Sequence, residues 1–459
     1  MYLAIDIGTG SLKAILKEGR EQWIEQIPLP LNQQGLLAEQ DPSLWLDALG
    51  AVVPRLLGRS GISASQIRAI ALSSHSPSLV PVDERGRALL PCLTWQDRRA
   101  TLQAERVSRI IQGFSDPSFF EPKILWIKEN EPEIYQKTKA FLQPKDFVIY
   151  HLTGEMIIDR SAARLSQAKK INEVDPAKLP REVNSWDVVA ETTASAKRFG
   201  LVAGIPVVAG GIDAYCEALG AGLVNDGQFG EVTGTSTCLS YCLHASKRVE
   251  GVATHVIPER SLYIMPMSMG GGTLKWFLNT LGGGLDYSDI AGALNQSPPG
   301  AKDLLFLPYL AGERSPIWDE RAKGVFFGIT SSHIKEDFLR AVLEGTAFAI
   351  RHCIESFSNA GLNPKTVRAT GGGSKLAVWN QIKSDVTGLT YQQLDMVDGA
   401  LLGALLLAAL AVEKRPIEDL VEENVRIKES FTPQQPPSVY DELYEKYQRL
   451  YPATKELMR

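Results

Sequence analysis

The sequence predicts an α/β protein whose chain is built from two similar halves. Short β runs alternate with amphipathic helical stretches along 459 residues, as in proteins that layer helices on sheets. A chain of this length provides two or three domains of ordinary size. DIGTGSLKAIL at 6–16 also resembles VTGTSTCLSYC at 232–242, since in both a Gly-Thr turn joins two apolar strands. We therefore expect a duplicated architecture with a boundary near residue 245, giving domains of 1–245 and 246–459.

The expected elements follow in order along the chain. Strands are predicted at 67–74, 206–211, 231–236 and 367–373. A helix is predicted within 334–357, because apolar side chains there fall on one helical face, and Gly361 is a suitable stop. The longest apolar run, at 401–412, is too short to span a bilayer and predicts a buried helix.

The composition and net charge argue against some classes of binding partner. The chain is 44% hydrophobic and 22% charged with a net charge of −5, which gives no electrostatic case for nucleic acid or an acidic membrane surface. Its five cysteines are odd in number and contain no CxxC pair, so we expect reduced packing residues. No charged n-region or cleavage site begins the sequence, and we expect a cytoplasmic protein.

The first Gly-Thr turn has the chemistry of a phosphate site. A turn of Gly, Ser and Thr between two strands, as at 8–11, exposes backbone N–H groups and hydroxyls that bind anions. The chain contains no G-x-x-x-x-G-K-[ST], and GTGSLK lacks the third glycine of a dinucleotide fingerprint. We therefore expect a hairpin clamp, with Lys13 within reach of the same phosphate.

Asp6, just before this turn, has two interpretations. A carboxylate beside polyphosphate repels it unless a cation such as Mg²⁺ lies between them. Alternatively, Asp6 caps the turn by accepting hydrogen bonds from its amides. The second Gly-Thr turn at 234–236 and the GGGS segment at 371–374 favour the nucleotide interpretation.

Ten segments together match one family, in the family's own order. They are AIDIGTGSLKA (4–14), AEQDPSLW (38–45), TWQDRR (94–99), KILWIKENEPEIY (123–135), LTGEMIIDRSAA (152–163), GGIDAYCEALGAG (210–222), TGTST (233–237), ERSPIWDERAKGVFFGIT (313–330), FLRAVLEGTAFAI (338–350) and TGGGSKLAVWNQIKSDVTG (370–388). Along nearly its whole length the chain resembles the FGGY carbohydrate kinases, which belong to the sugar kinase/actin/heat-shock-70 ATPase superfamily.

The resemblance implies a fold, cofactors and site residues. It implies two ribonuclease-H-like (actin-like ATPase) domains flanking a central cleft, with ATP and Mg²⁺ as cofactors and a homodimer as a frequent state. Asp213 matches the catalytic base and Asp6 the carboxylate near the metal. The residues expected to bind ATP are Gly8, Thr9, Gly10, Ser11, Lys13, Gly234, Thr235, Ser236, Gly271, Gly272, Lys275, Gly371, Gly372, Gly373 and Ser374.

The chemistry of phosphoryl transfer supports the role of Asp213. An alcohol is too weak an acid to ionise at neutral pH, so a carboxylate must accept its proton as the new bond forms. Asp213 follows the strand PVVAGGI, whose paired glycines permit close approach of ligands. It could instead simply cap the following helix, and both roles are compatible because a helix N-terminus stabilises the ionised carboxylate.

The substrate segment departs from the family pattern. Xylulose and gluconate kinases carry Gln-Met-His-Gly in the first domain, whereas this chain has LSSHSPSLVPVD at 72–83, with His75 in place of Gln and Ser76-Pro77 in place of Met-His. Residues expected to contact the substrate are His75, Ser76, Trp95, Asp97, Arg98 and Asp213. A structural role for His75 and a packing role for Trp95 stay open.

The sequence thus predicts an ATP-dependent kinase for a terminal hydroxyl of a small sugar, most of all a ketopentose of the xylulose or ribulose type. Three alternatives remain. One is a polyol kinase acting on glycerol or erythritol, and another is an actin-like ATPase without a sugar substrate. The third is a catalytically silent sugar sensor, against which the retained Asp213 and Asp6 argue.

Overall fold

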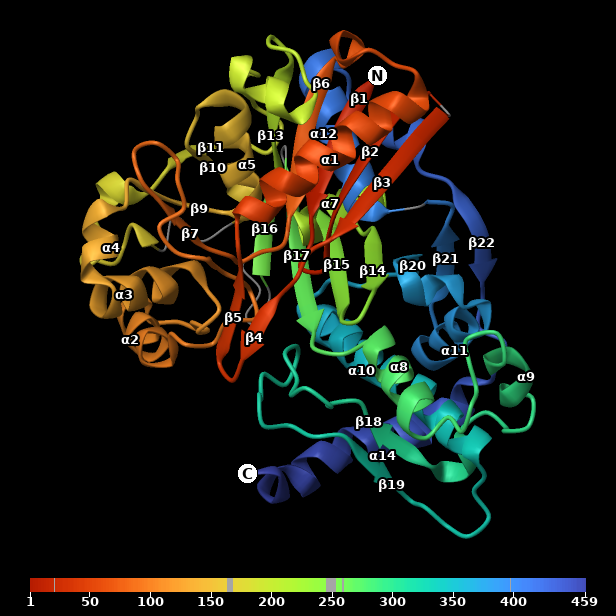
Figure 1. The fold of residues 1–459 in the computed structure, drawn as a ribbon. Helices are drawn as coiled ribbons and strands as arrows, with labels where there is room; N and C mark the ends of the chain where they lie inside the picture. The colour runs from red at the N-terminus through yellow and green to blue at the C-terminus, as the bar shows by residue number, and fades with distance from the viewer. Residues whose placement is uncertain (20, 163–167, 245–252, 258–259, 397) are drawn as a thin grey trace. The chain divides into compact units, whose positions relative to one another are not determined.

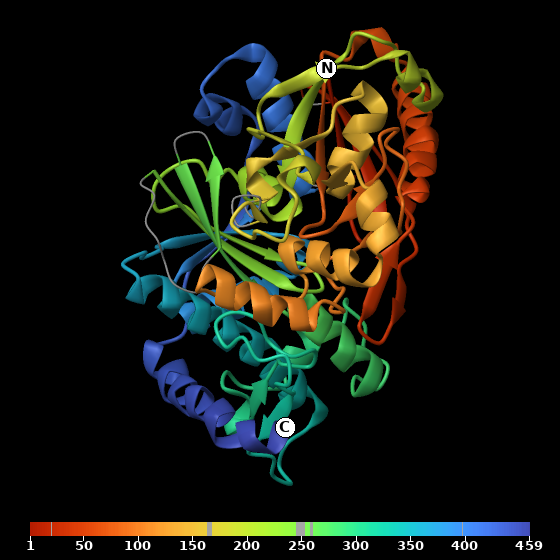
Figure 2. The same ribbon diagram turned by 90° about the vertical axis from the view of Figure 1, so that its left-hand side faces the viewer.

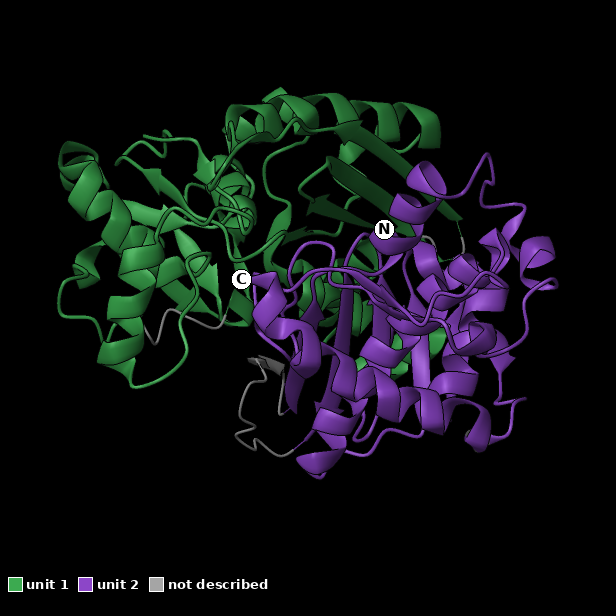
Figure 3. Ribbon diagram, turned by 90° about the horizontal axis from the view of Figure 1, so that it is seen from below, with its two compact units in different colours: residues 1–220, 255–257, 398–423 green, residues 221–254, 258–397, 424–459 purple. Residues whose placement is uncertain are grey.

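The computed structural model describes residues 1–19, 21–162, 168–244, 253–257, 260–396 and 398–459. The chain divides into two compact units, which are coloured in Figure 3. Unit 1 comprises residues 1–220, 255–257 and 398–423, and unit 2 comprises residues 221–254, 258–397 and 424–459. The boundary predicted near residue 245 lies outside the described residues. After residue 397 the chain returns to unit 1, so unit 1 is not one continuous stretch.

The central sheet of unit 1 has six strands (Figure 1). Their order is β12 (Val188–Glu191), β13 (Pro206–Ile212), β6 (Ala69–Ser74), β1 (Tyr2–Ile7), β2 (Ser11–Glu18) and β3 (Glu21–Pro28). The three strands β13, β6 and β1 are parallel, and β2, β3 and β12 are each antiparallel to their neighbour. Three parallel strands therefore end at one edge, where ligands of α/β proteins commonly bind.

Unit 2 repeats this pattern. Six of the seven strands in its sheet run in the order β17 (Arg260–Met267), β15 (Thr237–Leu243), β14 (Phe229–Thr233), β20 (Thr366–Thr370), β21 (Thr390–Leu394) and β22 (Ile427–Phe431). The strands β14, β20 and β21 are parallel, and β17, β15 and β22 are each antiparallel to a neighbour. The unit 1 sheet has the same arrangement when its strands are taken in the order β3, β2, β1, β6, β13 and β12. The hairpins β1–β2 and β14–β15 occupy equivalent places, which agrees with the weak sequence echo and with the predicted ribonuclease-H-like fold.

Helices cover both faces of the unit 1 sheet (Figure 2). The helices α1 (Ser43–Ser60) and α5 (Pro144–Thr153) pack on one face, and α7 (Asp213–Gly220) and α12 (Gly399–Glu413) on the other. Because successive side chains of a strand alternate between faces, Ile5 and Ile7 of β1 join the core that contains Trp45 of α1. Asp6 between them is directed to the face of α7 and α12.

The helix α12 confirms the buried helix predicted from the run at 401–412, since residues 400–409 are buried. It packs closely on α7 because both helices carry glycine at the crossing. A Cβ atom on Gly403 would lie 1.9 Å from the carbonyl oxygen of Cys216, and one on Gly220 would lie 2.1 Å from that of Gly399. The side chain of Asp398 caps α12 by accepting a hydrogen bond from the Leu401 amide.

The remaining elements complete each unit. In unit 1 they are β4 (Asn32–Gln34), β5 (Leu37–Gln40), β7 (Val80–Val82), β8 (Cys92–Leu93), α2 (Thr101–Ile111), α3 (Phe120–Asn130), α4 (Pro132–Lys137), β9 (Ala140–Leu142), β10 (Ile157–Asp159) and β11 (Arg181–Val183). In unit 2 they are α8 (Gly271–Thr280), α9 (Ile290–Leu294), β18 (Leu305–Leu307), β19 (Val325–Phe327), α10 (Lys335–Asn359), α11 (Ala377–Thr387) and α14 (Pro437–Thr454). The bounds of β16 are Ala253–Ile257 and those of α13 are Ile417–Asn424.

In the core of unit 2, the sheet packs against α10. This helix spans Lys335–Asn359, close to the predicted stretch 334–357. Phe357 near the end of α10 lies against the rings of Phe229 and Tyr241 from the sheet. Gly361 follows with a φ of +79°, a conformation that suits glycine at a helix end. None of the helices in the described part of the chain is long and apolar enough to cross a membrane.

Candidate active site

Three predicted site segments follow neighbouring parallel strands of unit 1. Ile7 at the end of β1 pairs with Ser74 of β6, and Ser74 pairs with Ile212 of β13. The turn that starts at Gly8, the segment from His75 and the side chain of Asp213 therefore emerge at the same edge of the sheet. Strands are spaced about 4.8 Å apart, so Asp213 lies two strands, or roughly 10 Å, from the turn.

The first turn is held from several sides. The Gly8 amide donates to the carbonyl of Ser11 across the turn at 2.9 Å. Trp95 donates its indole N–H to the hydroxyl of Thr9 at 2.8 Å, and the Gln40 amide donates to the Thr9 carbonyl at 2.6 Å. Gly10 at the tip is exposed, with open space where a Cβ atom would stand. The turn is thus fixed in shape while its tip stays accessible to a ligand.

A charged cluster lies beside this turn. Lys13 of β2 forms an ion pair with Asp398 at 2.7 Å, and Asp6 lies near both. Burial and, to a smaller extent, the Asp398 carboxylate raise the pKa of Asp6 to about 6, against the lowering effect of Lys13. Burial lowers the pKa of Lys13, but Asp398 and Asp6 outweigh it, so its pKa lies above the ordinary value. Lys13 therefore carries a positive charge at neutral pH.

Asp213 is the first residue of α7, and its carboxylate is half-buried. Its Oδ1 atom accepts a hydrogen bond from the Ala214 amide at 2.8 Å. Just before it, the register of β13 against β6 shifts between Val208 and Gly211. Gly210 has a φ of +67°, and a Cβ atom there would lie 1.7 Å from the Leu72 carbonyl oxygen. Only glycine fits at this bend, which sets the direction of the chain entering Asp213.

His75 is buried and fully hydrogen-bonded. Its Nδ1 atom lies 2.7 Å from the Ser78 hydroxyl and its Nε2 atom 3.0 Å from the Gln40 side-chain oxygen. Since Gln40 also bonds Thr9, His75 connects the segment 75–78 to the first turn. Burial lowers its pKa from the usual 6.5 to about 3, with a smaller effect from Lys123. The ring is therefore neutral at ordinary pH.

This burial predicts a pH dependence of stability. The unfolded chain binds a proton at His75 below pH 6.5, whereas the folded chain does so only near pH 3. The contribution of His75 to the free energy of unfolding is therefore complete above pH 6.5 and is lost as the pH falls toward 3. At pH 5 the loss is about 2 kcal/mol. Thermal unfolding of wild type and His75→Gln at pH 5 and 7 should show the gap between them narrowing at pH 5. Parallel pH dependence of the two proteins would contradict the prediction.

The buried side chain of Lys123 holds together two segments that contain predicted substrate residues. Lys123 of α3 is fully buried, and its ammonium donates to the carbonyls of Pro77, Leu93 and Thr94 at 3.0, 3.3 and 2.7 Å. It thereby joins the segment that contains Ser76 to the one that contains Trp95. Burial lowers the pKa of Lys123 to about 7.

Asp97 and Arg98 lie in separate ion pairs. Asp97 is fully buried, accepts a hydrogen bond from the Ala38 amide at 2.9 Å and pairs with Arg99 at 2.7 Å. Arg98, which is one-third exposed, pairs with Asp116 at 2.5 Å. Of these two, Arg98 is the one whose side chain reaches the surface, and the substrate roles predicted for both stay predictions.

The predicted nucleotide residues of unit 2 also gather at one sheet edge. Val232 of β14 pairs with Thr370 of β20, so the second turn at 234–236 and the segment from Gly371 emerge side by side. The amides of Gly271 and Gly272 donate to the carbonyls of Gly234 and Thr235 at 2.8 and 3.0 Å. A Cβ atom on either glycine would lie within 3 Å of these carbonyl oxygens. Ser236 accepts from the Gly234 amide at 2.9 Å and closes the turn.

The glycine-rich segment at 371–374 wraps around Thr233. A Cβ atom on Gly371 would lie 2.6 Å from the Thr233 carbonyl oxygen, and one on Gly373 would lie 2.4 Å from the Thr233 methyl group. Gly372 faces open space, and Ser374 donates to the Gly371 carbonyl at 2.8 Å. Lys275 in the first turns of α8 is exposed. The ATP-binding roles of these residues stay predictions.

Asp398 and Lys123 belong to these clusters although neither was among the predicted residues. In the sequence, Asp398 stands just before an apolar run and is recognisable only as a helix cap. That position does not indicate that Asp398 pairs with Lys13. Lys123 begins the matched segment KILWIKENEPEIY, yet a lysine in an amphipathic stretch is usually a solvated one. Its complete burial could have been inferred only from the three-dimensional contacts.

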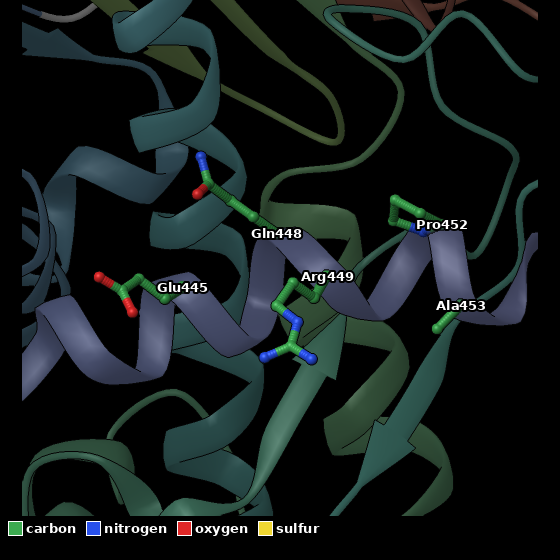
Figure 4. Close-up of a pocket in the computed structure, with 5 residues that line it drawn as sticks. All are labelled: Glu445, Gln448, Arg449, Pro452 and Ala453. Atoms are coloured by element: carbon green, nitrogen blue, oxygen red, sulfur yellow. The ribbon is translucent and has the colours of Figure 1, made fainter.

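A surface pocket lies away from the predicted residues. It is lined by Glu445, Gln448, Arg449, Pro452 and Ala453, which all belong to α14 (Figure 4). None of the predicted site residues lines it, so it is not the predicted site.

The family comparison covers most of the chain. Residues 1–220 match the N-terminal domain of the FGGY family of carbohydrate kinases and residues 231–412 match its C-terminal domain. The chain belongs to this family. It is a carbohydrate kinase, and ATP is the phosphoryl donor that the family implies.

Relatives of this kinase match along its whole length. It is 31% identical to the xylulose kinase of Escherichia coli, with all of both chains covered, and 30% identical to that of Staphylococcus epidermidis, with 100% and 97% covered. A solved xylulose kinase from Rhodospirillum rubrum superimposes on it with a TM-score of 0.89 at 26% identity, covering 100% of this chain and 99% of the other. The predicted family and two-domain fold are confirmed.

Proposed function

We propose that this kinase phosphorylates a terminal hydroxyl of a small ketopentose, with D-xylulose as the substrate, using ATP. The observation that supports the substrate most is the full-length likeness to several xylulose kinases at 30–31% identity. A cytoplasmic location and a homodimer are consistent with this proposal.

Asp213 is the proposed general base. Its half-buried carboxylate stands at the edge where three parallel strands end, two strands from the first turn. As the sugar oxygen attacks the γ-phosphorus, its proton passes to a carboxylate oxygen of Asp213 and ADP leaves with the electron pair of the broken P–O bond. The Ala214 amide on Oδ1 orients the carboxylate and favours its ionised form.

The first turn and Lys13 are the proposed phosphate-binding residues of unit 1. The hydroxyls of Thr9 and Ser11 and the amides of the turn offer hydrogen-bond donors, and Lys13 offers a positive charge. The proposed nucleotide residues of unit 2 are those of the second turn, of the start of α8 and of the segment from Gly371 to Ser374.

The residues around Asp6 suit Mg²⁺. The Oδ1 atom of Asp6 is buried and has no hydrogen-bond partner among the described residues. Such unsatisfied hard oxygen atoms are the donors that Mg²⁺ prefers. In the described part of the chain no group of three or more His, Cys, Asp or Glu lies where it could hold a metal ion. Mg²⁺ can instead be bound through one or two carboxylates together with phosphate and water. Bound there, Mg²⁺ would neutralise phosphate charge.

A panel of acceptors tests the proposal. ADP release is measured with ATP, Mg²⁺ and each of D-xylulose, D-ribulose, L-ribulose, glycerol, erythritol and D-gluconate. D-Xylulose is expected to give the highest kcat/KM, well above the rate without acceptor. A polyol or D-gluconate as the preferred acceptor would overturn the ketopentose substrate, and equal rates with and without every acceptor would favour an ATPase.

A further inference from the structure

A second buried cluster lies beside the strand that leads to Asp213. Lys145 and Asp146 of α5 and Asp159 at the end of β10 are fully or almost fully buried. Lys145 pairs with both carboxylates, at 2.7 Å in the case of Asp159. Burial opposes the charge on Lys145, but the two carboxylates outweigh burial and raise its pKa above the ordinary value. The cluster therefore holds a permanent ion pair inside unit 1.

Two serines connect this cluster to β13. Asp159 accepts hydrogen bonds at Oδ2 from the Ser161 amide at 2.8 Å and from the Ser185 hydroxyl at 2.7 Å. The Ser161 hydroxyl then accepts from the Ile212 amide at 2.9 Å, and the Ser185 carbonyl accepts from the Gly210 amide at 2.9 Å. Both serines are fully buried. The last residues of β13 are thus fixed where they bend.

The bond to Ile212 is the one nearest to the proposed base. Ile212 immediately precedes Asp213, and the sheet register is already broken between Val208 and Gly211. At such a bulge the ladder of backbone hydrogen bonds no longer defines the chain direction by itself. The Ser161 hydroxyl replaces a ladder partner at this point, and an unpaired amide buried there would be costly.

We propose that Ser161, held by Asp159 and Lys145, is a positioning residue that fixes the Ile212 amide and so aims the Asp213 carboxylate. This inference rests on the proposed role of Asp213 as the base. Ser161 acts through the main chain and touches neither ATP nor sugar in this proposal, so it should influence kcat and leave both KM values almost unchanged.

Ser161→Ala and Ser185→Ala form a matched pair for the test. Each removes one buried hydroxyl. Ser161→Ala removes the acceptor of the Ile212 amide, whereas Ser185→Ala removes a hydrogen bond to Asp159 and keeps the main-chain carbonyl that Gly210 uses. With ATP and D-xylulose, or the acceptor that the panel identifies in its place, Ser161→Ala should lower kcat about 10- to 100-fold. Ser185→Ala should lower it less than about twofold, with both KM values kept.

Hydrogen–deuterium exchange gives a readout that does not depend on turnover. A peptide covering residues 206–215 should exchange faster in Ser161→Ala than in Ser185→Ala, while the two variants unfold at similar temperatures. Equal kcat and equal exchange in the two variants would overturn the positioning role of Ser161. Full activity of Asp213→Asn would overturn the base and the inference together, whereas an inactive Asp213→Asn with equal serine variants overturns the inference alone.

Discussion

Asp213→Asn is expected to lower kcat for the sugar by about 10²- to 10⁴-fold, the usual contribution of general-base catalysis. The amide keeps the size of the carboxylate and can still accept the Ala214 hydrogen bond at its oxygen, so α7 should begin as before. It cannot take the hydroxyl proton. KM for ATP and the unfolding temperature should stay close to those of wild type, as measured by ADP release and calorimetry.

Glu217→Gln is the matched control, because Glu217 lies one turn further along α7. Burial raises the pKa of Glu217 well above its ordinary value, and Asp213, Asp398 and Asp6 raise it further. The raised pKa favours the neutral form of Glu217, which glutamine reproduces. We expect a kcat near that of wild type for this variant. If Asp213→Asn kept more than about a tenth of kcat, the base would have to be another group.

Local patterns predicted much of the fold. The apolar face of α10 and the uniformly apolar α12 each depend on neighbouring residues, and each was predicted close to its observed bounds. The strands predicted at 231–236 and 367–373 end earlier, at Thr233 and Thr370, because the glycine-rich turns begin there. The weak echo between the halves corresponds to equivalent hairpins in the two sheets. Such signals are carried by periodicity and turn residues, which a single sequence contains.

Contacts between distant residues were not predictable. Lys13 and Asp398 are 385 positions apart, and an apolar run such as that of α12 indicates burial without indicating the sheet that it covers. The sequence left His75 open between a substrate contact and a structural residue. Its burial depends on Gln40, which lies 35 positions away and also bonds the first turn.

The largest stability loss is expected from Lys383→Met in unit 2. Lys383 of α11 and Glu231 of β14 form a completely buried ion pair, and the Thr233 hydroxyl donates to the same Glu231 carboxylate at 2.6 Å. Removing the lysine leaves a buried carboxylate without its cation, which costs about 3–5 kcal/mol. For a unit of this size the melting temperature should fall by about 6–20 °C. Calorimetry measures this fall in melting temperature directly.

The double variant Glu231→Gln/Lys383→Met separates charge from packing. It removes both charges and keeps a hydrogen-bond acceptor for Thr233, so most of the lost stability should return. Because Gly371 and Gly373 lie against Thr233, the single variant should also raise KM for ATP while the double variant stays closer to wild type. A melting temperature within about 2 °C of wild type for Lys383→Met would mean that Glu231 is protonated or reaches water, and the ion pair would then contribute little.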